Sequence, residues 1–160
     1  YGGLWKAGSF ASSTGTGTTD VTTTGVDPAL VILQTVGATA STSIQTGGKR
    51  GMGMADGTRQ WAVAYDDLDA ADPTNASSYL HTTAALVSIT ANGATPTLND
   101  VYTVTTGSAK FTYNHTTASG TALDIIYLVG GVTAAGGGVT YPRLERGFGG
   151  VNRGLMLGSH

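Results

Sequence analysis

Short runs of alternating apolar and polar residues cover most of this chain, and Gly, Pro, Asn or Asp separates one run from the next. An alternation with a period of two is typical of strands that bury one face. Asp56-Gly57 and Asn92-Gly93 are dipeptides that favour tight turns between paired strands. No segment sustains the period of an amphipathic helix. The pattern predicts about nine strands, at residues 4–12, 18–24, 29–36, 50–55, 59–65, 79–90, 101–105, 110–114 and 123–129.

Two of the predicted strands carry more apolar residues than alternation requires. Residues 29–36 are apolar at nearly every position, and we expect this strand to be buried on both faces. Trp61, Val63 and Tyr65 share one face of residues 59–65, and we expect that face to point into the core. Between the strands, residues 38–48 indicate a loop or a weak edge strand, and residues 66–78 indicate a surface loop.

Strands of this number and spacing, punctuated by Gly and Pro, favour an antiparallel sandwich or barrel. Of these two architectures we predict an all-β, antiparallel β-sandwich, jelly-roll-like, that spans residues 1–131. The alternation stops after Gly130-Gly131, and residues 132–160 form a predicted extended, Gly-rich C-terminal arm. This arm is too rich in apolar and aromatic residues for a free linker, so we expect it to lie against its own sandwich or a neighbouring copy. The predicted partner-binding residues are Tyr141, Arg143, Leu144, Arg146, Phe148 and Arg153.

The composition indicates a β protein whose surface carries few charges. Charged residues make up 11% of the 160 residues, against about 25% in ordinary soluble domains. The chain contains 27 Thr, which favours strands, and only one Glu among its ten acidic residues. Disulfides are excluded because there is no Cys. No apolar run is long enough to predict a membrane helix.

The formal net charge of −2 is unevenly distributed. Residues 1–140 carry five basic and nine acidic groups, a net charge of −4, whereas residues 141–160 carry three Arg and one Glu, a net charge of +2. A nucleic-acid-binding protein typically carries a dense basic stripe. We therefore expect neither nucleic acid nor a membrane as a partner.

Four carboxylates lie close together in the sequence, at Asp66, Asp67, Asp69 and Asp72. Clustered oxygens suit Ca²⁺, but the spacing lacks the Gly and Glu of an EF-hand loop. The same residues could serve a glycosidase, which uses a pair of carboxylates. We favour a solvated loop over both alternatives and predict no metal site.

The chain shows no sequence motif of an enzyme active site. It contains no G-x-S-x-G, no H-E-x-x-H and no G-x-x-x-x-G-K. His81 and His115 lie on predicted strands, where alternation can point them outward. We predict that the protein is not an enzyme and needs no cofactor.

Three segments, VTTTGVDPALVILQTVG, RGMGMADGTRQWAVAYDD and LDIIYLVGG, follow one another along the chain. Together they resemble a module of virion structural proteins of tailed bacteriophages, of the decoration or tail-fibre type. In that module a strand, a Gly-x-x-Pro turn and a buried strand precede a Gly-rich hairpin, and a Tyr-Leu-x-x-Gly-Gly strand closes it. The resemblance covers about residues 8–131 and leaves out the arm. It implies a component of the phage particle and no catalytic residues.

We therefore expect a structural protein of the virion, and specifically a capsid decoration or cement protein that acts through subunit contacts. The expected partners are further copies of itself, in a closed arrangement with a trimer favoured, and other virion proteins such as the capsid shell. The alternative is a carbohydrate- or receptor-binding module of a tail fibre. In that alternative Trp61, Tyr65 and Tyr79 form an exposed platform for a sugar.

Overall fold

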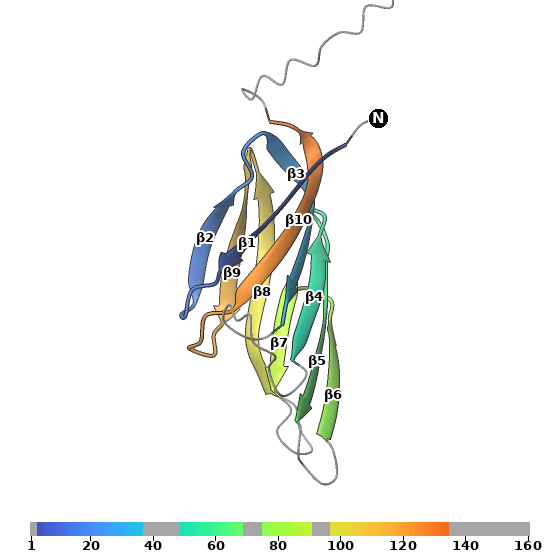
Figure 1. The fold of residues 1–160 in the computed structure, drawn as a ribbon, viewed down its shortest axis with the longest axis vertical. Coiled ribbons are helices and arrows are strands. Elements are labelled where there is room, and N and C mark those ends of the chain that lie inside the picture. The colour runs from blue at the N-terminus through green and yellow to red at the C-terminus, as the bar shows by residue number, and fades with distance from the viewer. Residues whose placement is uncertain (1–2, 37–48, 69–74, 91–96, 135–160) are drawn as a thin grey trace, which may run out of the picture.

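The structure, a computed structural model, describes residues 3–36, 49–68, 75–90 and 97–134, and within these ranges every regular element is a strand. The all-β fold predicted from the alternation is confirmed (Figure 1). The ten strands are β1 (Leu4–Ala11), β2 (Gly17–Thr22), β3 (Val26–Thr35), β4 (Arg50–Ala55), β5 (Gln60–Leu68), β6 (Asn75–His81), β7 (Leu86–Thr90), β8 (Thr97–Gly107), β9 (Lys110–Thr117) and β10 (Asp124–Thr133).

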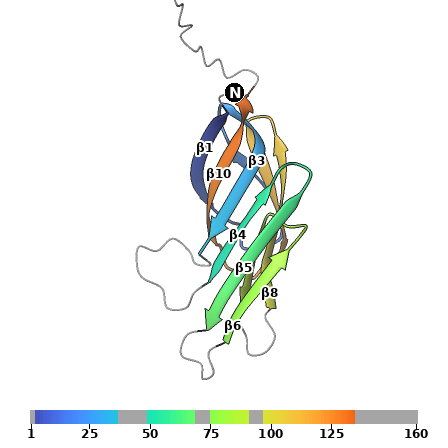
Figure 2. The same ribbon diagram turned by 90° about the vertical axis from the view of Figure 1, so that its right-hand side faces the viewer.

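The strands form two antiparallel sheets that pack as a sandwich, as predicted. One sheet has six strands in the order β1-β10-β3-β4-β5-β6, and the other has four in the order β2-β9-β8-β7. Figure 2 looks onto the six-stranded sheet, in which the first and last strands, β1 and β10, are neighbours. β10 extends to Thr133, so residues 132 and 133 of the predicted arm belong to the sheet, and residues 135–160 lie outside the described residues.

The core consists of two clusters that differ in side-chain size. The larger cluster packs aromatic rings from both sheets, and the ring of Phe10 stacks on that of Tyr113 at a centroid distance of 5.0 Å. The smaller cluster lies between β5 and β7 and contains Ala62, Ala64 and Val87. The two sheets therefore approach each other more closely at this end of the sandwich.

Glycines in β4 permit this close approach. A Cβ atom at Gly51 would lie 2.3 Å from the carbonyl oxygen of Val87, and one at Gly53 would lie 2.2 Å from that of Ala85. The backbone of β7 thus packs directly on the backbone of β4. Because β4 alternates Gly with Met, the small residues face inward and Met52 and Met54 face outward.

The close approach of the two sheets also explains why the prediction for β5 is wrong. Trp61, Val63 and Tyr65 were expected to point into the core, but they lie on the outer face, and Ala62 and Ala64 are buried instead. The expectation that residues 29–36 are buried on both faces is also wrong. In β3, Val31 and Leu33 are buried, whereas the other face is the outer face of the sheet.

The segment 79–90, predicted as one strand, is divided between the two sheets. It contains the end of β6 and all of β7, which belong to different sheets, and the chain crosses between them over residues 82–85. Residues 84–89 are all buried, so their apolar character comes from the crossing and from both faces of β7. The predicted loop at 66–78 is also shorter than expected, because β5 extends to Leu68 and β6 begins at Asn75.

The predicted turn at Asp56-Gly57 is confirmed as the hairpin between β4 and β5. The Asp56 carboxylate accepts hydrogen bonds from the backbone N–H groups of Thr58, at 3.0 Å, and Arg59, at 2.7 Å. These bonds lower the pKa of Asp56. Gly57 adopts a φ of 83°, which a residue without a side chain adopts without strain.

Candidate functional site

The outer face of the six-stranded sheet is apolar across its width. Large hydrophobic side chains from five of its strands are exposed there, and they include Met52 at 49%, Leu80 at 62% and Ile126 at 54%. Side chains at alternate positions of a strand share one face. We name this surface the apolar face, and its residues are Trp5, Ile32, Met52, Met54, Trp61, Val63, Tyr65, Leu80, Ile126 and Leu128.

The strand register places these side chains in continuous rows (Figure 2 shows the strands). In one row Leu128 lies opposite Ile32, which lies opposite Met54, and Met54 lies opposite Trp61. In the next row Met52 lies between Gln34 and Val63, and Val63 is followed by Leu80. Directly opposite residues on adjacent strands have Cβ atoms about 5 Å apart. The apolar face is therefore one contiguous patch.

Trp5 extends this patch onto the edge strand β1. It lies opposite Gly130 of β10, and its side chain is 60% exposed. A Cβ atom at Gly130 would lie only 2.7 Å from the six-membered ring of the indole. The glycine thus leaves the space in which the ring lies against the sheet.

The outer face of the four-stranded sheet has the opposite character. Asp20 on β2 pairs with Lys110 on β9 at 2.6 Å and accepts a hydrogen bond from Thr112 at 2.5 Å. These two bonds lower the pKa of Asp20, with the bond to Lys110 contributing most. On β2, β8 and β9 the neighbouring outward positions are polar too: Thr18, Thr22, Thr103, Thr105, Asn114 and Thr116. The same sandwich therefore presents one face suited to water and one that is not.

A shallow hollow of about 370 Å³ lies at one end of the apolar face. Tyr65 and Arg50, which are cross-strand partners, line it together with Met52. Gln34 and Ser78 also line it, although most of its wall is apolar. The exposed ring of Tyr65 therefore lies beside residues that carry hydrogen-bonding groups, as a carbohydrate-binding role would require.

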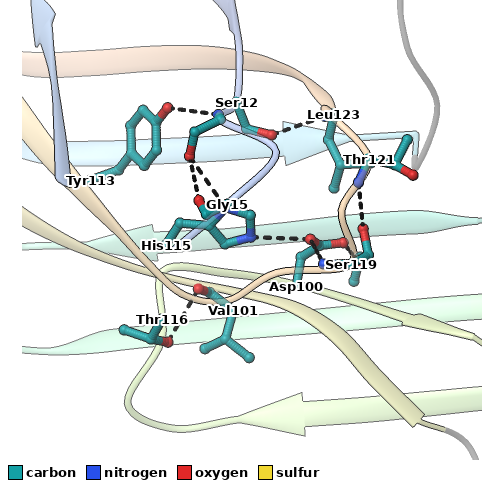
Figure 3. A network of polar contacts seen from close by, with 12 residues as sticks. Ser12, Gly15, Asp100, Val101, Tyr113, His115, Thr116, Ser119, Thr121 and Leu123 are labelled. Atoms are coloured by element: carbon teal, nitrogen blue, oxygen red, sulfur yellow. Dashed lines mark hydrogen bonds and ion pairs between the residues drawn. The ribbon is translucent and has the colours of Figure 1, made fainter. Parts of the chain in front are cut away.

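A buried polar network connects three strands and two connections on the other side of the core (Figure 3). The Nε2 atom of His115 lies 3.0 Å from Oδ1 of Asp100, and the Nδ1 atom lies 3.5 Å from Oγ of Ser13. Asp100 also accepts hydrogen bonds from the hydroxyl of Ser88, at 2.6 Å, and from the backbone N–H of Ser119, at 3.0 Å. His115 is fully buried, so the expectation that it points outward is wrong.

The network includes a Ser, a His and an Asp, but its geometry indicates a structural role, in which it holds neighbouring strands and connections together. The hydroxyl of Ser13 donates to the carbonyl oxygen of Gly15 at 2.7 Å, a shorter contact than the one to His115. The ring of His115 stacks on Tyr102 at 4.2 Å and has no exposed surface. Through Asp100 and His115, strands β7, β8 and β9 are joined to the connections that follow β1 and β9.

The residues singled out in the sequence occupy different places. The predicted partner-binding residues of the arm, and Asp69 and Asp72 of the carboxylate cluster, lie outside the described residues. Asp66 is buried in β5, so it is not part of a solvated loop.

Trp61 and Tyr65 share the apolar face, whereas Tyr79 lies opposite the buried Ala64 and points to the other side of the sheet. The three aromatic residues do not form one platform.

Trp5, Leu80, Ile126 and Leu128 were not identified from the sequence as surface residues of interest. The available signal was the run of apolar residues at both odd and even positions, as in residues 29–36 and 125–129. A strand with one face in the core needs apolar residues at every second position only. The additional apolar residues are those of the apolar face.

Within the described part of the chain, no group of three or more His, Asp or Glu residues is placed to hold a metal ion. The described residues also include no helix that is long and apolar enough to cross a membrane. No protein-family model, curated protein or solved structure matches this chain.

Proposed function

We propose that this chain is a structural subunit of a phage particle, of the capsid decoration or cement type, and that it acts through contacts with neighbouring subunits. The observation that carries the proposal is the apolar face on the six-stranded sheet. Soluble monomers rarely expose contiguous apolar patches of more than a few hundred Å², and larger ones mark interaction sites.

The size of the apolar face supports this assignment. With about 180 Å² for each large side chain, the exposed fractions of its residues correspond to roughly 800 Å². This is about the area that one partner contributes to a stable protein–protein interface. The outer face of the other sheet is covered by Thr, Asn and an ion pair, so the apolar character is specific to one side.

We assign the subunit to a phage particle because residues 8–131 resemble virion structural proteins. The scarcity of charged residues, 11% of the chain, also suits a subunit whose surface is largely covered in an assembly, because charges are depleted at interface cores. The arm residues named above stay a prediction for contacts with the shell or another subunit.

The proposal is tested on particles purified from a host that produces the phage encoding this chain. Quantitative mass spectrometry is expected to find the chain in purified particles at a fixed ratio to the shell protein. The variant Met52→Lys is expected to lose incorporation, because it places a charge in the apolar face. The matched control Thr105→Lys, on the outer face of the four-stranded sheet, is expected to be incorporated normally. Absence of the unmodified chain from particles would refute the proposal.

A carbohydrate-binding role is a second candidate because of the hollow beside Tyr65. An exposed aromatic ring next to Arg50 and Gln34 offers stacking and hydrogen bonds to one ligand. A glycan array probed with the labelled chain tests this role. Binding that is lost in Tyr65→Ala and kept in Tyr65→Phe would support it, and an array without bound glycans would count against it.

A further inference from the structure

We infer that the occupant of the apolar face is the same face of a second copy of this chain, so that two six-stranded sheets pack face to face in a twofold dimer. This inference rests on the proposed function in so far as both assign the apolar face to subunit contacts. Two sheets that pack in this way lie about 10 Å apart with their strands roughly aligned.

The distribution of charge on the face fits a partner identical to itself. The two central rows, from Leu128 to Trp61 and from Ile126 to Leu80, contain no charged residue. Among the outward positions beside these rows, Arg50, Asp67 and Asp124 lie toward one end of the sheet, and Arg59 lies beside Trp61 at the turn between β4 and β5. In a twofold contact a central charge would face its own copy or be buried without a partner, which is costly. The apolar centre avoids that cost.

The composition of the apolar face also favours a second copy of the chain over a lipid surface as its occupant. Amphipathic elements that bind membranes typically surround their apolar residues with Lys and Arg. Around the apolar face Arg50 lies at one end and Arg59 lies beside Trp61 at the other, and these are matched by Asp67 and Asp124 near Arg50 and by Asp56 in the turn that holds Arg59. This balance gives no attraction to an anionic bilayer, whereas the interfaces of homodimers are more apolar than other surfaces.

The edge of the sheet formed by β1 is less suited to association than the face. Lys6 on the edge strand β1 lies at an inward-facing position and is half-buried. A charged residue that points inward on an edge strand discourages the addition of another strand. Association through β1 is therefore less favourable than association through the apolar face.

A single patch of this kind favours a twofold dimer over the trimer expected from the sequence. A twofold contact uses the same patch on both subunits, whereas a ring of three joins two different patches of each subunit. The described residues provide one large apolar patch, and the opposite outer face is polar. We therefore expect two chains in the assembly that forms through this face.

The experiment measures mass and tryptophan emission on the full chain over a wide range of concentrations. The chain has two Trp residues, Trp5 and Trp61, and both lie on the apolar face, so emission reports whether the face is covered. Analytical ultracentrifugation is expected to give twice the single-chain mass of 16.1 kDa at high concentration. On dilution, the fall in mass and a red shift of the emission are expected to coincide.

Variants locate the contact. Met52→Lys, or Val63→Lys if the first variant fails to fold by circular dichroism, is expected to weaken dimerisation by at least roughly a hundredfold. Thr105→Lys is the control and is expected to dimerise normally. A mass of three chains would overturn the inference. So would a single-chain mass at all concentrations, whether the emission is blue-shifted because residues 135–160 cover the face or red-shifted because nothing does.

The two proposals can fail separately. A chain that dimerises through the apolar face but is absent from particles would refute the virion role and leave the dimer intact. A chain that is monomeric in solution but enters particles, and loses incorporation in Met52→Lys, would refute the dimer and assign the face to a shell protein.

Discussion

The indole ring of Trp5 lies over Gly130, on the neighbouring strand, in space that any side chain at position 130 would occupy. This relationship holds a large aromatic surface flat against the edge of the sheet. It is local, because the ring is an exposed side chain and not part of the core.

Gly130→Ala is therefore expected to displace the ring of Trp5 without unfolding the sandwich. The clash is with the end of an exposed side chain that can rotate away, so the free energy of unfolding should fall by about 1 kcal/mol, at the low end for overpacking. Dimerisation is expected to weaken, because the displaced ring no longer lies flat in the contact. Urea unfolding and ultracentrifugation measure the two effects. A dimer of unchanged affinity would show that Trp5 lies outside the contact.

Gly53→Ala is expected to be far more damaging than Gly130→Ala. Its Cβ atom would meet the carbonyl oxygens of Ala85, at 2.2 Å, and Trp61, at 2.5 Å, and neither backbone atom can rotate away. We expect a loss of about 3 kcal/mol in the free energy of unfolding, at the upper end for overpacking. Met54→Ala, at the next position but on the outer face, is the control and should cost less than about 1 kcal/mol in the monomer. Equal costs for the two variants would contradict the close packing of β7 on β4.

The contrast between Gly53 and Met54 shows how much of the fold could be predicted from the sequence. The positions of most strands, the hairpin at Asp56 and the sandwich architecture follow from alternation and turn dipeptides, which are local properties. The inward direction of Gly53 and Ala62 does not, because it depends on how closely β7 approaches from the other sheet. Bulk alone indicated the wrong face of β5 for the core.

The apolar face was not recognised from the sequence for a related reason. Ile126 and Leu128 are as apolar as Ile125 and Val129, their buried neighbours in the same strand. Local pattern cannot distinguish a residue buried by its own fold from one that a partner covers. The division of residues 79–90 between β6 and β7 likewise follows from a crossing between sheets, and no turn dipeptide marks it.

The buried network around Asp100 is expected to contribute strongly to stability. His115→Phe keeps an aromatic ring against Tyr102 but removes the 3.0 Å contact to the Asp100 carboxylate. Because the carboxylate is then buried with one partner fewer, we expect a loss of about 3 kcal/mol in the free energy of unfolding. Asn114→Ala, at the adjacent outward position, is the control and should change it by less than about 1 kcal/mol. An unchanged unfolding midpoint for His115→Phe would show that the contact between His115 and Asp100 does not stabilise the fold.

Because Tyr102 is buried, we expect the protein to lose stability at high pH. Burial raises the pKa of its phenol well above the ordinary value of about 10, and nearby Asp100 adds to the effect. Below a pH of about 10 the phenol is protonated in both the folded and the unfolded chain, so its ionisation does not change the free energy of unfolding. Above that pH the unfolded chain releases the proton and the folded chain keeps it, so the free energy of unfolding falls as the pH rises. Tyr102→Phe removes the ionisable group and is expected to flatten this fall relative to the unmodified chain. Urea unfolding at a series of alkaline pH values measures the slopes. Parallel slopes in the two proteins would show that Tyr102 ionises equally in the folded and unfolded states.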